Sequence, residues 1–398
     1  MLVLHPRFDE AGQPQGHDPV LYFHPLASRD SEEFWANPRY GEFWVGPRPT
    51  LEELQARTGI TCAHSDQLAD ELSKDAGQVG LRVVPGADER VSALVEQVRE
   101  ENSVAHEQDD DAKLAEALSE LRLIKDDWEV DQMRQAIAAT ITGFEHIVKS
   151  LPRAVSHPRG ERVVEGAFAA VAREEGNGLG YDTIAAAGNN ATILHWIRNN
   201  GPVRDGELIL IDAGIELDSL YTADLTRTLP VNGRFTSVQR RVYEAVLDAA
   251  DAAFDLARPG VRFRDVHEAA MEVLAHRLEE WGILPVSAQE ALSPDGQQHR
   301  RWMPHGTSHH LGIDVHDCAQ ARREMYLDAQ LRPGMIFTIE PGLYFKSDDL
   351  AIPAEYRGIG IRIEDDVLVT PSGVENLSAA LPRRANEVET WMAGLGHI

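Results

Sequence analysis

The first part of the chain mixes short apolar runs with polar and proline-rich stretches. Its pattern predicts a strand at Pro19–His24 and helices at Leu51–Thr58 and Glu89–Arg99. The acidic stretch Glu107–Asp111 follows, and we interpret it as a solvated corner or a helix start. We place a domain boundary between this stretch and Lys125.

Helical periodicity is stronger after this boundary. Asp126 and Glu129 have the spacing of a capping box, and apolar residues recur at helical spacing from there to Leu151. Further helices are predicted at Val163–Glu175, from Thr236 or Ser237 to Ala253, and at Val266–Trp281.

Short β-type runs separate these helices. They are Leu208–Asp212, Asp224–Leu229, Ile336–Glu340 and Ile359–Val369. Because strands and helices do not alternate in a strict βαβ rhythm, the pattern favours an α+β fold over a doubly wound sheet.

Two of these strands are alike in sequence. Gly206–Gly214 and Gly334–Gly342 each open on glycine, continue through apolar residues and reach a carboxylate, Asp212 or Glu340. A small residue or proline and a second glycine then follow in both. The repeat indicates a duplicated half-domain that presents two carboxylates to one cleft.

The composition excludes several classes of partner. With 38 Lys+Arg against 65 Asp+Glu the net charge is −27, which disfavours binding to nucleic acid or to an anionic membrane surface. A hydrophobic content of 43% is enough for a sizeable core. Two distant cysteines predict neither a disulfide framework nor a cysteine metal site. The short apolar stretch at the start does not fit a signal peptide, so we expect a cytoplasmic protein.

Four acidic residues lie on or beside the apolar strands: Asp212, Asp224, Glu340 and Glu364. A carboxylate buried in such a place costs on the order of several kcal/mol unless it is paired, protonated or bound to a metal. Taken singly, each could be a helix cap, a turn acid or an ion-pair partner. Their recurrence at four equivalent places favours a shared metal site.

Histidines gather in one segment, which contains His305, His309, His310 and His316. Two glycines within it argue against a helix and predict a strand or loop with an exposed backbone. We interpret His310 as structural, and a surface histidine cluster is the alternative for the segment. His195 stands apart, and on its own it could be a core histidine.

Four carboxylates and one imidazole do not describe a structural zinc site, which prefers thiolates and imidazoles. Oxygen-rich ligation with one nitrogen suits Mn(II), Co(II) or Fe(II), with Zn(II) as a further choice. Five such ligands can hold two ions about 3.5–4 Å apart around a shared hydroxide.

These segments together resemble the Xaa-Pro peptidases, prolidase and aminopeptidase P, of the pita-bread metallopeptidase family. The segments that carry the resemblance are Ile211–Gly214, Thr222–Thr228, His305–Asp317, Thr338–Tyr344 and Tyr356–Asp366. The resemblance implies a catalytic domain at residues 125–398, made of duplicated α+β halves around a curved, mainly antiparallel sheet. Residues 1–124 would then be a smaller, shortened α/β N-terminal domain.

The resemblance also implies roles for individual residues. The implied metal ligands are Asp212, Asp224, His309, Glu340 and Glu364, with Asp224 and Glu364 bridging two divalent ions, for which we expect Mn(II). The implied catalytic residues are Glu340, as proton shuttle, with His195, His305 and His316. Substrate contacts are expected from His195, His316, Tyr181 and Arg362. Arg362 would read the proline carboxylate of a dipeptide, or else would only neutralise Glu364.

We therefore expect a dinuclear-metal hydrolase that cleaves the bond before proline in Xaa-Pro dipeptides. The alternatives are an aminopeptidase P acting on longer Xaa-Pro-Yaa peptides, a methionine aminopeptidase, a creatinase-like enzyme without metal, and a non-catalytic pita-bread binding protein. The expected partners are small proline-containing peptides, with neither nucleic acid nor membrane, and a second copy of the chain in a homodimer.

Overall fold

The computed structural model describes residues 1–74, 76–105 and 109–396. Part of the predicted acidic corner, Glu107 and Gln108, lies outside the described residues. The chain divides into two compact units, Met1–Ala115 and Glu116–Ile398. This division falls inside helix α6 (Asp110–Leu121), between the acidic stretch and Lys125, and the assignment of domains 1–124 and 125–398 stays a prediction.

The first unit contains a three-stranded sheet in the order β1-β2-β3. Strand β1 (Leu2–Phe8) is antiparallel to β2 (Pro14–Phe23), and β2 is parallel to β3 (Thr61–His64). The helices of this unit upstream of α6 are α1 (Glu32–Ala36), α2 (Glu42–Val45), α3 (Leu51–Thr58), α4 (Leu68–Lys74) and α5 (Glu89–Glu101). The strand and two helices predicted for this part of the chain are present, the strand as the end of a longer β2.

The second unit is built on long amphipathic helices. They are α7 (Asp127–Val155), α8 (Gly160–Glu175), α9 (Ser237–Leu256) and α10 (Phe263–Glu280), with the shorter α11 (Ala288–Leu292) and α12 (Ala385–Gly394). The predicted capping box begins α7, where the Glu129 N–H donates to Asp126 Oδ1 at 2.9 Å. Thr236 is the N-cap of α9. In the described part of the chain, no helix combines the length and apolar character needed to cross a membrane.

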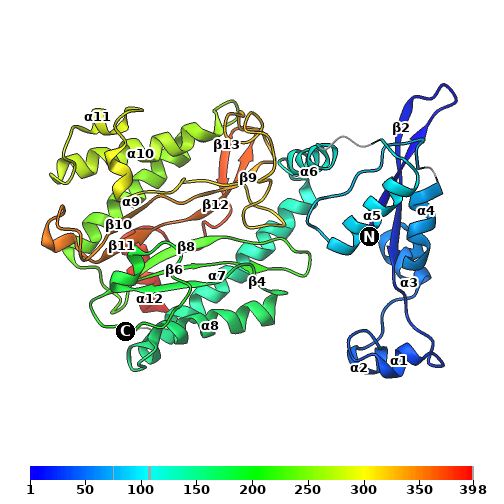
Figure 1. Ribbon diagram of the computed structural model, residues 1–398. Helices are drawn as coiled ribbons and strands as arrows, with labels where there is room; N and C mark the ends of the chain where they lie inside the picture. The colour runs from blue at the N-terminus through cyan, green and yellow to red at the C-terminus, as the bar shows by residue number, and fades with distance from the viewer. Residues whose placement is uncertain (75, 106–108, 397–398) are drawn as a thin grey trace. The chain divides into compact units, whose positions relative to one another are not determined.

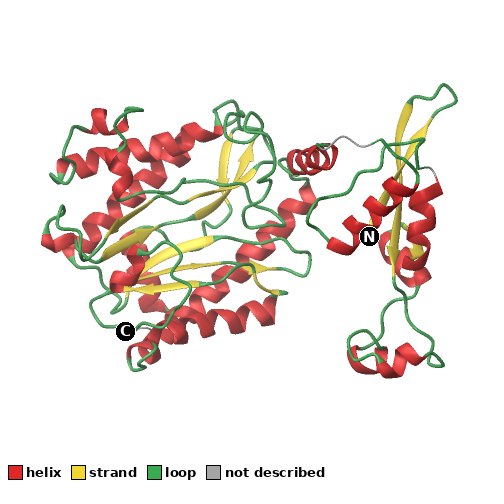
Figure 2. Cartoon of the chain, in the orientation of Figure 1, coloured by secondary structure: helices red, strands yellow, loops and turns green. Residues whose placement is uncertain are grey.

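In the described part of the second unit, the strands pair in antiparallel fashion. One sheet has the order β5 (Ile184–Ala187), β6 (Leu208–Ala213), β8 (Leu225–Pro230), and a second has the order β13 (Gly373–Asn376), β12 (Asp365–Thr370), β9 (Ile336–Ile339). Two ribbons complete the set, β10 (Gly342–Phe345) with β11 (Ile359–Arg362), and β4 (Gly178–Leu179) with β7 (Ile215–Glu216). Figure 2 shows these strands between the helices, and the α+β class is confirmed.

The two similar sequence segments each form a strand that reaches a carboxylate, although β6 is the middle strand of its sheet and β9 an end strand. Strand β6 leads to Asp212 and strand β9 leads to Glu340, each from within a three-stranded antiparallel sheet. Helices α7 and α8 pack as one pair and α9 and α10 as another (Figure 1). The repeat therefore places two strand-end carboxylates, Asp212 and Glu340, in the second unit.

One sequence expectation needs correction. Ile359–Val369 is not a single strand, because β11 pairs with β10 whereas β12 pairs with β9. The β-structure is interrupted between β11 and β12, and there the Glu364 N–H donates to the Thr226 carbonyl at 3.1 Å. This break turns Glu364 toward β8 and the acidic cluster.

Candidate active site

A cavity of about 540 Å³ opens among the strand ends of the second unit. It is lined by every residue that the sequence singled out: Tyr181, His195, Asp212, Asp224, His305, His309, His316, Glu340, Arg362 and Glu364. The remaining lining residues are Asp182, Ile184, Leu194, Ile197, Gly306, Ser308 and Val315. The chain thus brings all the candidate residues together, although their individual roles stay predictions.

Strand ends position the acidic side chains. Asp212 lies near the end of β6, Asp224 directly precedes β8, and Glu340 directly follows β9. All four carboxylates of the cluster are largely withdrawn from solvent, and Asp224 is 5% and Glu364 2% exposed. This burial makes their mutual approach expensive without a compensating cation.

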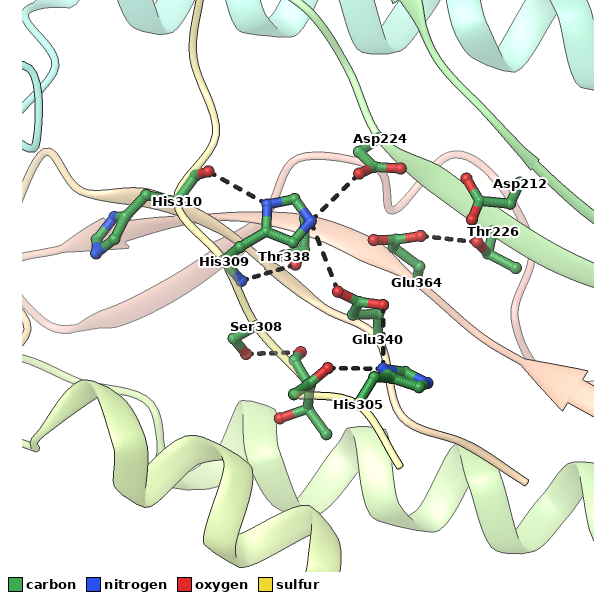
Figure 3. Close-up of polar contacts among 12 residues, drawn as sticks. Asp212, Asp224, Thr226, His305, Ser308, His309, His310, Thr338, Glu340 and Glu364 are labelled. Carbon is green, nitrogen blue, oxygen red and sulfur yellow. Dashed lines mark hydrogen bonds and ion pairs between the residues drawn. The ribbon is translucent and has the colours of Figure 1, made fainter. Parts of the chain in front are cut away.

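His309 comes from the histidine-rich loop, which is not helical, as expected. The His309 N–H donates to Thr338 Oγ1 at 3.2 Å, and the Thr338 N–H donates to the His309 carbonyl at 2.9 Å. These bonds fasten the loop to β9. They aim His309 at the carboxylates while His310 turns the other way, as Figure 3 shows.

The imidazole of His309 is the centre of the cluster. Its Nε2 lies 3.3 Å from Asp224 Oδ2 and 3.6 Å from Glu340 Oε1. One ligand atom each from Asp224, His309 and Glu364 lie within 4.8 Å of one another. Glu364 is held in place by Thr226, whose Oγ1 donates to Glu364 Oε2 at 2.7 Å (Figure 3).

Without a bound cation, burial disfavours the ionised form of the carboxyl groups in the cluster. Burial raises the pKa of Glu340 to about 7 and raises the pKa of Glu364 well above its usual range. Burial also raises the pKa of Asp212, although the Arg362 charge opposes this. Glu340 and Glu364 are therefore inclined to keep a proton that a metal ion would displace.

The histidines of the cavity divide into two kinds. Burial alone would lower the pKa of His309, but its hydrogen bond to Asp224 and the Glu340 charge raise it to about 9. Burial, helped by the Arg362 charge, lowers the pKa of His305 to about 3, and burial also lowers the pKa of His316. His305 and His316 are thus neutral hydrogen-bonding groups at physiological pH.

These residues fit a pair of divalent metal ions. The donor set is four carboxylates and one imidazole, which matches cations that prefer oxygen with some nitrogen. Of the residues that line the cavity, only Arg362 carries a permanent positive charge, and it pairs with Asp212 alone. The remaining acidic groups converge around one imidazole, His309, and have no permanently charged protein partner, which is the arrangement that a bound metal resolves.

Arg362 is buried against the cavity wall and is held by several partners. Its Nη2 donates to Asp212 Oδ2, its Nη1 to the Tyr344 hydroxyl at 3.0 Å, and its Nε to Thr226 Oγ1 at 3.2 Å. It therefore pairs with Asp212 and not with Glu364, the partner considered from the sequence. All three guanidinium nitrogens already have a protein acceptor.

Three further side chains face the cavity in different ways. Tyr181 donates through its hydroxyl to Asp212 Oδ1 at 2.7 Å and also contacts Asp224 Oδ1. His195 is exposed in the cavity mouth, so the alternative of a core histidine is wrong. The His316 ring packs edge-on against His309 with centroids 4.5 Å apart, and it has no hydrogen-bond partner among the described residues.

The sequence reasoning missed two buried acids that support the site. Asp366 Oδ2 accepts the Asp224 N–H at 3.1 Å and so holds the backbone of this candidate ligand. Glu161, fully buried in α8, anchors the loop that carries His195. Its sequence signal was its place on the apolar face of α8 with Val164 and Phe168, where an acid is unusual.

Comparisons with known proteins identify the class of this arrangement. The model of metallopeptidase family M24 matches residues 131–371. The chain is 47% identical over 395 residues to Xaa-Pro aminopeptidase 1 of Streptomyces coelicolor, covering 99% of this chain and 76% of that protein. Xaa-Pro aminopeptidase 2 of the same organism is 49% identical over 392 residues, covering 98% and 79%.

Solved structures agree with these sequence relatives. A His-to-Ala variant of Escherichia coli aminopeptidase P superposes with a TM-score of 0.83 at 28% identity, covering 100% of this chain and 86% of that one. Proline aminopeptidase P II from Yersinia pestis has a TM-score of 0.81 at 30% identity, covering 98% and 86%.

The fold and the acidic cavity are those of a metallopeptidase, and the chain belongs to metallopeptidase family M24. Within this family it is an Xaa-Pro peptidase of the aminopeptidase P type, with the pita-bread fold expected from the sequence.

Proposed function

We propose that the protein is a two-metal Xaa-Pro aminopeptidase that removes the N-terminal residue from peptides whose second residue is proline. The observation that carries this proposal is the convergence of Asp212, Asp224, His309, Glu340 and Glu364 in one cavity. We propose these five as the ligands of two divalent ions, with Mn(II) as the expected metal. Bound ions would lower the pKa of a water molecule and polarise the scissile carbonyl.

The chain's own residues then divide the remaining work. Glu340, which faces both His305 and His309 at 3.6 Å, is suited to move a proton from the attacking water to the departing proline nitrogen. The proline nitrogen must gain a proton as the bond to it breaks, so cleavage requires a proton donor on this side.

The two neutral histidines, His305 and His316, differ in whether their ring nitrogens already have hydrogen-bond partners. His305 is committed, because its Nε2 contacts the Tyr344 hydroxyl and its Nδ1 the Gly306 carbonyl, both at 2.7 Å. His316 has no such partner in the described part of the chain. We therefore assign His316 to the developing negative charge on the substrate, His195 and Tyr181 to substrate binding, and His305 to holding Tyr344.

The preference for peptides longer than a dipeptide rests on Arg362. Three of its five N–H donors are given to Asp212, Tyr344 and Thr226 and its charge is paired with Asp212, so it has less to offer a second carboxylate. The relatives named above, which are called Xaa-Pro aminopeptidases, support the same choice. A dipeptidase remains the second candidate, favoured by the fact that Arg362 lines the cavity.

Substitution of Asp224 tests the two-metal proposal. Asp224→Ala should lower the metal content of the purified protein and abolish hydrolysis of Xaa-Pro-Yaa peptides. Asp182→Asn is a matched control, because this exposed acid lines the same cavity but is not among the five proposed ligands. Full metal content and activity in Asp224→Ala, or equal losses in the control, would contradict the proposal.

A further inference from the structure

A second group of metal-ligating side chains lies in the first unit, at the ends of two parallel strands. His24 directly follows β2 and His64 ends β3, and Phe23 pairs with His64 in the register of these strands. The pairing brings the two imidazoles to one edge, with ring centroids 5.2 Å apart. Asp66 follows in the short 3-10 helix Ser65–Gln67. We call His24, His64 and Asp66 the edge cluster.

The three side chains of the edge cluster face one another closely enough to share an ion. One ligand atom from each lies within 4.8 Å of the others. The side chains are 43%, 33% and 82% exposed in the order given, so an ion can enter and a water molecule can complete its coordination.

His24 is oriented by a carboxylate on its far side. Its Nε2 lies 2.8 and 2.9 Å from the two carboxylate oxygens of Glu33, and Arg48 Nη2 donates to Glu33 at 2.7 Å. A proton held on Nε2 toward Glu33 leaves the Nδ1 lone pair of His24 available. Metal-bound histidines characteristically donate their other ring N–H to a carboxylate in this way.

His64 and Asp66 present two electron-rich atoms to each other. His64 Nδ1 accepts the Asp66 N–H at 3.2 Å, so it carries a lone pair that a metal ion would take over from this N–H, and Asp66 Oδ2 lies 3.4 Å from the same nitrogen. A tetrahedral ion with ligand bonds of about 2.1 Å has edges of about 3.4 Å between its ligands. The pair is thus already spaced as one edge of such a site.

We propose that the edge cluster binds one Zn(II) ion through His24, His64 and Asp66, with water as the fourth ligand and Glu33 orienting His24. Two imidazoles and one carboxylate suit zinc, whereas the acidic cavity of the second unit suits harder cations. The proposal does not depend on the proposed peptidase reaction, because its ligands are separate residues and its readout is metal content.

Zinc content of the full chain tests the edge cluster. The protein would carry Asp224→Asn and Glu364→Gln to weaken the other site, be stripped with a chelator, be loaded with Zn(II) and be desalted before elemental analysis. Adding His64→Ala to this background should remove one zinc per chain. Glu33→Gln should keep the zinc but weaken its binding at least about tenfold in a competition titration.

Controls within the same unit decide the outcome. His5→Ala and His17→Ala remove histidines of β1 and β2 outside the edge cluster, the first half-buried and the second exposed, and they should leave the zinc content unchanged. If His64→Ala disturbs folding by circular dichroism, Asp66→Asn replaces it, because that side chain is largely exposed. Unchanged zinc in the edge-cluster variants, or equal loss in the controls, would overturn the proposal.

Discussion

The Glu161 carboxylate, fully buried in helix α8, accepts the backbone N–H of Gly201 at 2.6 Å. It also accepts hydrogen bonds from the Ala187 N–H at the end of β5, and from Asn190 Nδ2 and Trp196 Nε1 in the segment that follows this strand. The approach is so close that a Cβ at Gly201 would lie 2.8 Å from Glu161 Oε2. One carboxylate thus organises the loop that carries His195 into the cavity mouth.

Glu161→Gln should disturb this loop, because an amide NH₂ would face N–H donors. We expect kcat/KM for Xaa-Pro-Yaa peptides to fall by about tenfold or more through misplacement of His195, and unfolding to become easier by about 1–3 kcal/mol. Steady-state kinetics beside denaturant unfolding measure both effects.

A double-mutant cycle separates positioning from general destabilisation. In the presence of His195→Ala, Glu161→Gln should cost little further activity, because its effect passes through His195. Glu389→Gln is the matched control. Glu389 is a buried acid of helix α12 that, like Glu161, accepts a backbone N–H, that of Phe235, at 3.0 Å. Additive losses in the first cycle would show that Glu161 acts on stability alone.

Metal binding to the acidic cavity should release protons. In the metal-free protein the pKa of Glu340 is raised to about 7 and that of His309 to about 9, so both groups hold protons near neutrality. A cation must displace these protons, and its apparent affinity should therefore rise as the pH increases from about 7 to 9. Calorimetric titration with Mn(II) in two buffers of different ionisation enthalpy measures the release. An enthalpy independent of the buffer would contradict this picture.

Acid stability should depend on Asp349. Hydrogen bonds from Arg301 at 2.8 and 3.0 Å are the main reason that the pKa of this carboxyl is lowered to about 2. A lowered folded-state pKa stabilises the protein above the unfolded pKa near 4, and this contribution is lost as the pH falls toward 2.

Asp349→Asn should therefore lower the free energy of unfolding by about 1–2 kcal/mol near pH 6, with the difference from wild type disappearing near pH 2. Asp348→Asn changes the exposed neighbouring acid and should have little effect at either pH. Urea unfolding of the three proteins at both pH values tests this. A deficit of Asp349→Asn that persists at pH 2 would count against the ion pair as its cause.

Arg362→Lys should reduce turnover of dipeptides and longer peptides by similar factors. Lysine cannot donate simultaneously to Asp212, Tyr344 and Thr226, so the cavity wall loses its geometry whichever peptide is bound. The measurement is kcat/KM on Xaa-Pro and Xaa-Pro-Yaa substrates with the same first residue. A loss confined to the dipeptide would instead make Arg362 a reader of the proline carboxylate.

The sequence predicted the secondary structure and the candidate residues well where a repeating pattern was present. The capping box at Asp126 and the strand leading to Asp212 both follow from local rules of spacing. The break at Ile363–Glu364 did not, because it depends on which partner each half of the segment pairs with.

The residues that position the site could not be predicted from local sequence patterns either. Glu161 is far in sequence from the Gly201 amide that it binds, and Arg362 is far from its partner Asp212. Such contacts arise from tertiary packing, and a single sequence carries no record of them beyond an acid on an apolar helix face.

The most direct test of the proposed function compares two substrates that differ only in length. The metal-loaded enzyme would be assayed on an Xaa-Pro-Yaa tripeptide and on the Xaa-Pro dipeptide with the same first residue. We expect a kcat/KM for the tripeptide at least about tenfold higher, equivalent to about 1.4 kcal/mol of transition-state stabilisation. Equal or faster cleavage of the dipeptide would contradict it and make the protein a dipeptidase.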